Sequence, residues 1–227
     1  MSVSSNSVQK TARLTGFLYL LLAPLGYFGI GYIPTLIVSG NVQATISNIA
    51  SHEMLIRLSI VSAFLEQLVN IFVALLLYKL LNSVNKTMAL LMVILLFFGV
   101  PIAMLNELNQ FAILQLVNGN ANSFSLIPLF LNLHQSGISI AQIFWGLWLF
   151  PMGYLVYKSG FIPRVIGVFL ILGSLGYLID SFAFFLFPQL NLKVSQYTFV
   201  GELLIALWLF IKGVNVKKWE KRTSKSS

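Results

Sequence analysis

The sequence predicts an all-α membrane protein, a bundle of six transmembrane helices with both termini in the cytoplasm. Charged residues make up only 9% of the chain, whereas soluble domains contain about 25%. Six long apolar stretches divide the sequence, and most of them exceed the roughly 20 residues that a helix needs to cross the hydrocarbon core. The basic residues between these stretches fall almost entirely on alternate sides, which is the asymmetry that orients membrane helices.

The apolar stretches are continuous, and this favours helices over a transmembrane β-barrel. Barrel strands are about 10 residues long and alternate between apolar and polar side chains. A continuous apolar helix instead satisfies its own backbone hydrogen bonds, as hydrocarbon requires. The mean hydropathy of +0.88 agrees with this interpretation.

The first three predicted spans are 14–38, 55–81 and 88–116. The first follows Lys10 and Arg13 and is longer than the roughly 7–15 apolar residues of a signal peptide, so we expect it to be retained. At the start of the second, Glu53 and Arg57 are four residues apart and are expected to form an ion pair on the first helical turn. The third contains Pro101, which frees a backbone carbonyl and can kink the helix.

The last three predicted spans are about 134–157, then 162–187 and 194–211. Pro163 suits the first turn of the fifth span, where a missing backbone N–H has no cost. The chain then divides into a short cytoplasmic N-terminus (1–12), a six-helix transmembrane domain (13–213) and a basic cytoplasmic tail (214–227). The tail after Trp219 is polar and is expected to be disordered.

The lysines and arginines give the orientation. With the N-terminus inside, the inner segments hold twelve of them and the outer segments hold only Arg57 and Lys193. The inner set is Lys10, Arg13, Lys79, Lys86, Lys158, Arg164, Lys212, Lys217, Lys218, Lys221, Arg222 and Lys225. This pattern predicts a multi-pass protein of the cytoplasmic membrane, and the tail is placed to attract anionic lipid.

Four acidic residues lie within the predicted spans, although a carboxylate at the bilayer centre costs roughly 2.5–3.5 kcal/mol or more. Such residues usually face the interior of a bundle, and here all four fall in the outer half or near the midplane. We therefore predict an outward-facing polar cavity that binds a small molecule or lipid. Its candidate residues are Glu66, Asn70, Glu107, Gln110, His134, Gln142, Asp180 and Glu202.

Structural roles for the same acids remain open. Glu107 and Glu202 lie near helix ends and could simply reach the membrane interface. Asp180 could pair with Arg57 or His134 in the same leaflet. For Glu66, which is the deepest, a functional role and a structural pairing are equally compatible with the sequence.

Sequence motifs favour no particular reaction. Residues 52–56 begin like the zinc-protease motif, but the last position is Ile56 rather than histidine. The chain has two histidines and no cysteine, so we expect no metal site, no disulfide and no cofactor. The net charge of +8 is concentrated in the tail, which is typical of a topology signal and not of a nucleic-acid surface.

Several segments together resemble a known family. The most specific are Gly153-Tyr154-Leu155, then residues 159–164 (SGFIPR), Gly167, and residues 176–180 (GYLID), and the likeness extends to residues 13–20 (RLTGFLYL). With these segments the chain is similar to the DUF4386 family of bacterial membrane proteins, whose function is unknown. The resemblance implies a compact multi-span protein and singles out Arg13, Arg57, Pro163, Arg164 and Asp180 as motif positions. It implies no catalytic residue.

We therefore expect a non-enzymatic membrane protein that serves transport or sensing through its cavity. One alternative is a membrane-embedded enzyme that acts on a lipid-like substrate, with Glu66 or Asp180 as the acid or base. Another is a structural partner of other membrane proteins. The sequence does not give the oligomeric state.

Overall fold

A computed structural model describes residues 5–119 and 121–226, and the described chain is almost entirely helical without a strand. Residues 1–4 of the predicted N-terminal segment and residue 227 of the tail lie outside this description. The elements run in the order α1 (Ser5–Gly31), η1 (Ile33–Leu36), α2 (Val42–Ser51), α3 (Glu53–Leu81), α4 (Lys86–Val117), η2 (Ala121–Leu126), α5 (Ile127–Ser159), α6 (Arg164–Leu186), η3 (Pro188–Leu190), α7 (Ser195–Thr198), α8 (Val200–Ile211) and α9 (Val216–Ser226).

Five of these helices, which are α1, α3, α4, α5 and α6, are long and apolar enough to cross a membrane. The segment Ser195–Ile211 reaches that standard only together with Val216–Ser224, across a bend of 99°. The protein is thus an all-α membrane bundle, and its predicted sixth span is a short, broken helix. With 12 residues, α8 is about 18 Å long, whereas the hydrocarbon core is about 30 Å thick.

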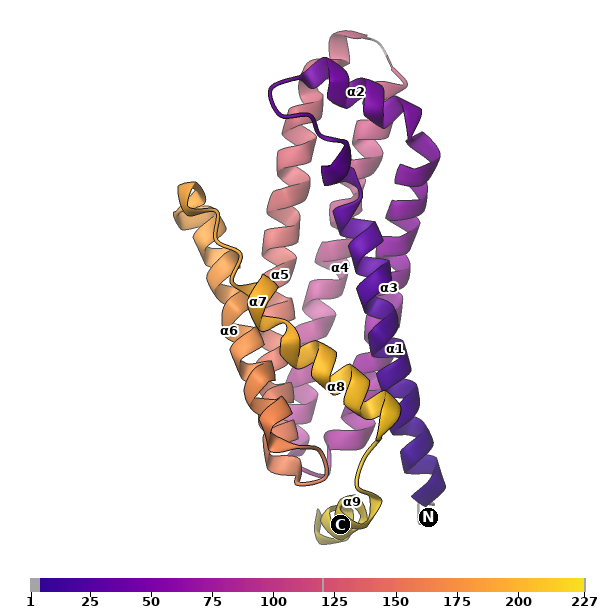
Figure 1. The fold of residues 1–227 in the computed structure, drawn as a ribbon, viewed down its shortest axis with the longest axis vertical. Helices are drawn as coiled ribbons and strands as arrows, with labels where there is room; N and C mark the ends of the chain where they lie inside the picture. Colours follow the sequence, from indigo (N-terminus) through magenta and orange to yellow (C-terminus); the bar gives the residue numbers. More distant parts are fainter. Residues whose placement is uncertain (1–4, 120, 227) are drawn as a thin grey trace.

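The broken sixth element lies obliquely across the bundle. Figure 1 shows α8 running from the side of α6 down to α1, while α3, α4 and α5 form the long upright helices behind it. Short connections, residues 82–85 and 160–163, make α3 and α4 and then α5 and α6 antiparallel neighbours, whereas η1 and α2 lie between α1 and α3. The helix α2 crosses the end of the bundle that is uppermost in Figure 1.

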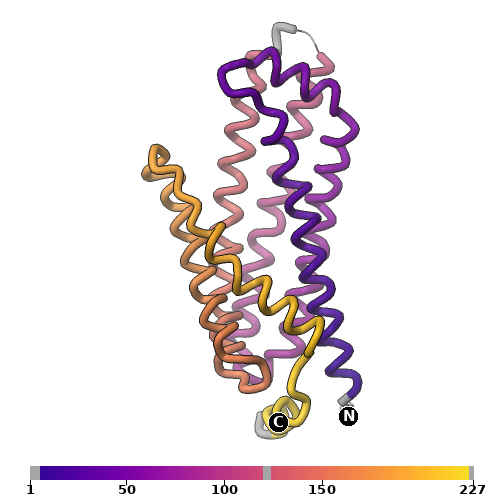
Figure 2. Tube along the Cα trace, in the orientation of Figure 1, coloured from indigo at the N-terminus to yellow at the C-terminus, as the bar shows by residue number. Residues whose placement is uncertain are grey.

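Both described ends of the chain lie at one end of the bundle, where α9 crosses beneath the long helices (Figure 2). The same end collects the start of α1, the end of α3, the start of α4, the end of α5 and the start of α6. These are the segments that carry the predicted inner lysines and arginines, so we call it the basic end. The alternation of charge in the sequence therefore corresponds to a physical separation in the structure.

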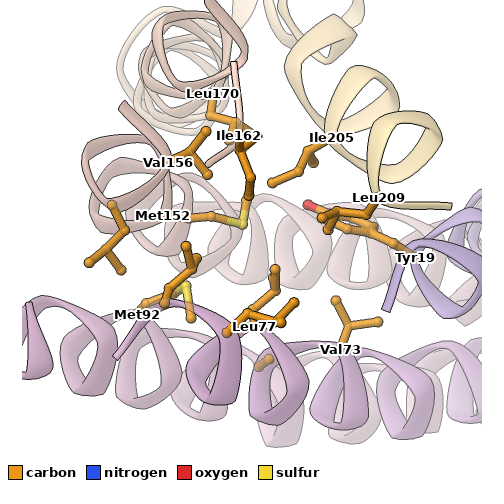
Figure 3. Packing of buried hydrophobic residues seen from close by; sticks show 14 of the residues in the cluster. Tyr19, Val73, Leu77, Met92, Met152, Val156, Ile162, Leu170, Ile205 and Leu209 are labelled. Atoms are coloured by element: carbon orange, nitrogen blue, oxygen red, sulfur yellow. The ribbon is translucent and has the colours of Figure 1, made fainter. Parts of the chain in front are cut away.

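The main hydrophobic core fills the half of the bundle next to the basic end. Figure 3 shows Leu77, Met92, Met152 and Leu209 converging from α3, α4, α5 and α8. These four side chains are fully buried. A second, smaller cluster around Ile49, Ile56 and Ile113 lies toward the α2 end.

The tail is helical rather than disordered, so that expectation was wrong. Trp219 on α9 is buried, and its Nε1–H donates a hydrogen bond to the carbonyl oxygen of Leu80 at 3.0 Å. Arg222 donates to the carbonyl oxygen of Val84 at 3.4 Å. Composition alone missed this helix because one buried tryptophan holds an otherwise polar segment against the ends of α3 and α4.

Helices α5 and α6 approach each other most closely where two glycines meet. A Cβ atom built on Gly167 would lie 2.6 Å from the carbonyl oxygen of Gly153, and one on Gly153 would lie 2.7 Å from that of Gly167. Membrane helices use small residues in this way because packing, and not the hydrophobic effect, holds them together. Both glycines belong to the segments that carry the family resemblance.

We therefore expect Gly167→Ala to force α5 and α6 apart and to lower the free energy of unfolding by about 1–3 kcal/mol. Gly31→Ala is the control, because a Cβ there meets nothing nearer than Tyr27 at 3.9 Å. Reversible unfolding in mixed micelles measures both variants. Equal stability of the two would contradict the close packing.

Candidate functional site

A cavity of about 560 Å³ lies within the bundle, near the middle of its long helices. Its walls come from α1, α3, α5, α6 and the α7–α8 segment. The lining residue Glu66 shows how deep the cavity lies, since it is midway along α3 between Glu53 and Leu81. The lining residues are Tyr19, Leu20, Leu22, Ala23, Gly26, Tyr27, Ile30, Gly31, Glu66, Asn70, Gln142, Trp145, Trp148, Tyr177, Ser195, Gln196, Phe199, Glu202, Leu203 and Ala206.

Four of the eight predicted binding residues line this cavity. They are Glu66, Asn70, Gln142 and Glu202, and they come from three different helices. The rest of the lining is mainly apolar and aromatic. The cavity is therefore less polar than the sequence suggested, with a few polar groups set in apolar walls.

Glu202 holds three helices together through its carboxylate. Its Oε2 accepts a hydrogen bond from the hydroxyl of Tyr19 at 2.9 Å, and its Oε1 accepts one from the hydroxyl of Tyr177 at 3.0 Å. The three side chains come from α8, α1 and α6. Glu202 therefore turns inward, and the alternative that it only reaches the membrane interface is wrong.

Glu66 has fewer partners than Glu202. Its Oε2 accepts a hydrogen bond from Nε2 of Gln67 at 3.1 Å. Gly26 on α1 makes room for the carboxylate, because a Cβ built there would lie 3.0 Å from Oε1. One helical turn further along α3, Asn70 is 6% exposed, and its buried Oδ1 has no hydrogen-bond partner.

The cavity opens between α1 and the α7–α8 segment. Tyr27 on α1 is 82% exposed and Phe199, between α7 and α8, is 44% exposed, although both line the cavity. The neighbouring Gln196 on α7 is also exposed. The mouth therefore lies on the side of the bundle, beyond the upper end of α8.

Asp180 shapes this mouth without lining the cavity. Its two carboxylate oxygens accept hydrogen bonds from the backbone N–H groups of Val194 and Ser195, at 2.7 and 2.8 Å. Asp180 thereby fixes the start of α7, whose Ser195 and Gln196 form part of the lining. The proposed pairing of Asp180 with Arg57 or His134 was wrong, because backbone amides occupy both of its oxygens.

The other three predicted binding residues form a separate buried cluster between α4 and α5. Nε2 of His134 lies 3.3 Å from Oε1 of Glu107 and 2.8 Å from Nε2 of Gln110. All three side chains are buried, and Glu107 is only 3% exposed. They do not line the cavity. Glu107 therefore does not reach the membrane interface, contrary to the structural alternative for it.

Glu53 and Arg57 lie at the start of α3, away from the cavity. Arg57 Nη2 is 2.6 Å from Glu53 Oε1, and both side chains are substantially exposed. In the described part of the chain, no three His, Asp or Glu side chains gather as a metal site requires. The chemistry that the cavity can offer is thus carboxylate, amide and aromatic.

Sequence reasoning missed the aromatic half of the site. Tyr19, Trp145, Trp148 and Tyr177 line the cavity beside the acids. Within apolar spans these residues resembled ordinary core or interfacial aromatics. The available signal was chemical: a buried tyrosine hydroxyl needs a hydrogen-bond partner, and few acceptors exist in these spans.

The sequence model of a protein family, described as a domain of unknown function (DUF4386), matches residues 14–213. This range includes every residue that lines the cavity. The chain belongs to the DUF4386 family. This DUF4386 protein is also 33% identical over 156 residues to an uncharacterised protein from Archaeoglobus fulgidus, covering 68% of this chain and 83% of the relative. None of the solved structures matches it.

We expect Tyr19→Phe and Tyr177→Phe each to lower the free energy of unfolding by about 0.5–2 kcal/mol, because each leaves an oxygen of Glu202 without its donor. Tyr27→Phe is the control, since its side chain is largely exposed. Unfolding titrations in mixed micelles measure all three variants. If the Tyr19 and Tyr177 variants match the control, Glu202 does not tie these helices.

Proposed function

We propose that this DUF4386 protein is a non-enzymatic protein of the cytoplasmic membrane that binds a small amphipathic molecule in the cavity between α1, α3, α5, α6 and the α7–α8 segment. Binding at this position would serve transport or sensing. The observation that carries the proposal is the cavity itself, whose polar groups Glu66, Asn70, Gln142 and Glu202 are set in apolar walls.

The size and lining of the cavity support this proposal. Small-molecule sites in proteins usually measure about 300–1,000 Å³ and combine apolar walls with a few convergent polar groups. The cavity, at about 560 Å³, falls within this range. Its mouth opens between helices at the side of the bundle, so an amphipathic ligand can approach it from the lipid.

The hydrogen bonds of the acids favour binding over catalysis. Asp180, one of the two acids considered for a catalytic role, holds two backbone amides and does not line the cavity. Glu202 accepts two phenol hydrogen bonds that occupy both of its oxygens. Of the two acids that line the cavity, only Glu66 keeps an oxygen that accepts no hydrogen bond in the described chain.

The basic end supports a second contact, with anionic lipid. Lys217, Lys218, Lys221 and Arg222 are exposed on α9 beside the buried Trp219. A juxtamembrane basic cluster is attracted to anionic headgroups by about 1 kcal/mol per charge. This contact would anchor α9 at the cytoplasmic surface, at the opposite end of the molecule from α2.

Single cysteines test whether the cavity admits small solutes, and the chain has no native cysteine to interfere. We expect Gln142→Cys, in the lining, to react with a small water-soluble thiol reagent in detergent. Its neighbour Ala141, which is fully buried on another face of α5, provides the control Ala141→Cys. Mass spectrometry follows the labelling, and an unreactive Gln142→Cys would contradict an accessible cavity.

A thermal-shift screen of small amphipathic molecules of every charge class tests binding, because a ligand of the folded state raises its melting temperature. We expect at least one compound to stabilise the wild type and to lose its effect in Ala23→Trp, which fills the cavity. Leu90→Trp, on an exposed face of α4, is the matched control and retains the effect. If no compound shows this dependence on the cavity, the proposed function is wrong.

A further inference from the structure

The ionisable side chains that line the cavity are acids and phenols. Glu66 and Glu202 are the acids, and Tyr19, Tyr27 and Tyr177 are the phenols. Neither lysine nor arginine nor histidine lines the cavity in the described residues. Because a carboxylate at this depth is stable only beside a proton, a donor or a cation, the lining favours a ligand that brings positive charge.

The two acids differ in the number of hydrogen bonds that their carboxylates accept from the protein. Both oxygens of Glu202 accept phenol hydrogen bonds. Glu66 accepts one hydrogen bond, at Oε2 from Gln67, and its Oε1 accepts none from the described residues. The free acceptor capacity of the two acids is therefore concentrated at Glu66.

Asn70 gives independent evidence for a ligand that donates hydrogen bonds. It is 6% exposed, lines the cavity, and its Oδ1 has no partner in the described chain. A buried acceptor left without a donor costs about 1–3 kcal/mol. Glu66 and Asn70 are four residues apart on α3 and therefore neighbours on one face of the helix. Together they form a pair of acceptors that an N–H donor can satisfy.

Aromatic side chains form much of the remaining wall. Trp145 and Trp148 come from α5, Tyr177 from α6 and Phe199 from the α7–α8 segment, and the rings of Tyr19 and Trp148 lie 6.0 Å apart. Such rings pack against an apolar body. Their faces also attract cations, by about 0.5–2 kcal/mol per favourable contact.

We propose that the cavity selects an organic ammonium ion with an apolar body. Its ammonium group contacts Glu66 and Asn70, and its apolar body packs among the aromatic side chains of α5 and α6. This inference rests on the proposed function and adds the chemical class of the ligand. Three separate observations indicate this ligand class: the acids in the lining, the unpaired Oδ1 of Asn70 and the aromatic walls.

Three probes of similar shape and different charge test the selection: phenylbutylamine, phenylbutanol and phenylbutyrate. In the purified full-length protein we expect the amine, which is protonated at neutral pH, to bind about tenfold or more tightly than the alcohol, a factor that corresponds to about 1.4 kcal/mol. The anionic phenylbutyrate binds more weakly still. Thermal shift and equilibrium dialysis give the two readouts.

Single substitutions test which residues cause the preference for the amine over the alcohol. Glu66→Gln removes the preference for the amine over the alcohol, while Glu107→Gln, an acid outside the cavity, leaves it unchanged. Asn70→Leu is the second variant: it is close in volume, keeps every charge, and weakens the amine more than the alcohol. It preserves the test if Glu66→Gln does not fold. Ala23→Trp abolishes binding of the amine, which separates the cavity from nonspecific partition into detergent.

The outcomes distinguish the two proposals. If alcohol and amine bind equally and Ala23→Trp abolishes both, the cavity is a binding site but the ammonium selection is wrong. The selection is also overturned if phenylbutyrate binds best, or if amine binding persists in Ala23→Trp. If no compound of any charge class depends on the cavity, both the ligand class and the proposed function fail.

Discussion

The structure depends on hydrogen bonds that stabilise a carboxylate inside a membrane bundle. Glu202 lies on a helix too short to cross the hydrocarbon core, and two phenol hydrogen bonds, from Tyr19 and Tyr177, compensate its carboxylate. Because these donors stand on α1 and α6, satisfying one acid also fixes where α8 crosses the bundle. The cavity lies against the first half of α8, and Asp180 completes its wall by holding the start of α7.

Features that follow from hydropathy and charge could be predicted from the sequence. The long apolar stretches became α1, α3, α4, α5 and α6, because a long apolar run has few stable forms in lipid besides a helix. The inner lysines and arginines lie at one end of the bundle, because a chain that crosses back and forth brings alternate connections to the same end. Glu66 and Asn70, two of the predicted binding residues, both line the cavity, since their spacing of four residues fixes a common helical face.

Features that depend on the contacts between helices could not be predicted. Depth along a span placed Glu107 and Glu66 near one another, but rotation of α4 directs Glu107 toward His134 on α5 and away from the cavity. Hydropathy also gave no sign of the 99° bend that follows Ile211, since the apolar run 194–211 has the composition of an ordinary span. The polar tail folds because Trp219 finds a carbonyl at the end of α3, a partner that composition cannot reveal.

In the proposed mode of binding, the acids and aromatic residues at mid-depth form one site for an organic cation. Crystals grown from a lipid mesophase with a bromine-labelled phenylbutylamine would test it most directly, because bromine gives an anomalous signal that locates the ligand. We expect a bromine peak among Trp145, Trp148 and Tyr177, with the amine density beside Glu66. Bromine found only at the lipid-facing surface, with an empty cavity, would show that the cavity is not a binding site for the ammonium ion.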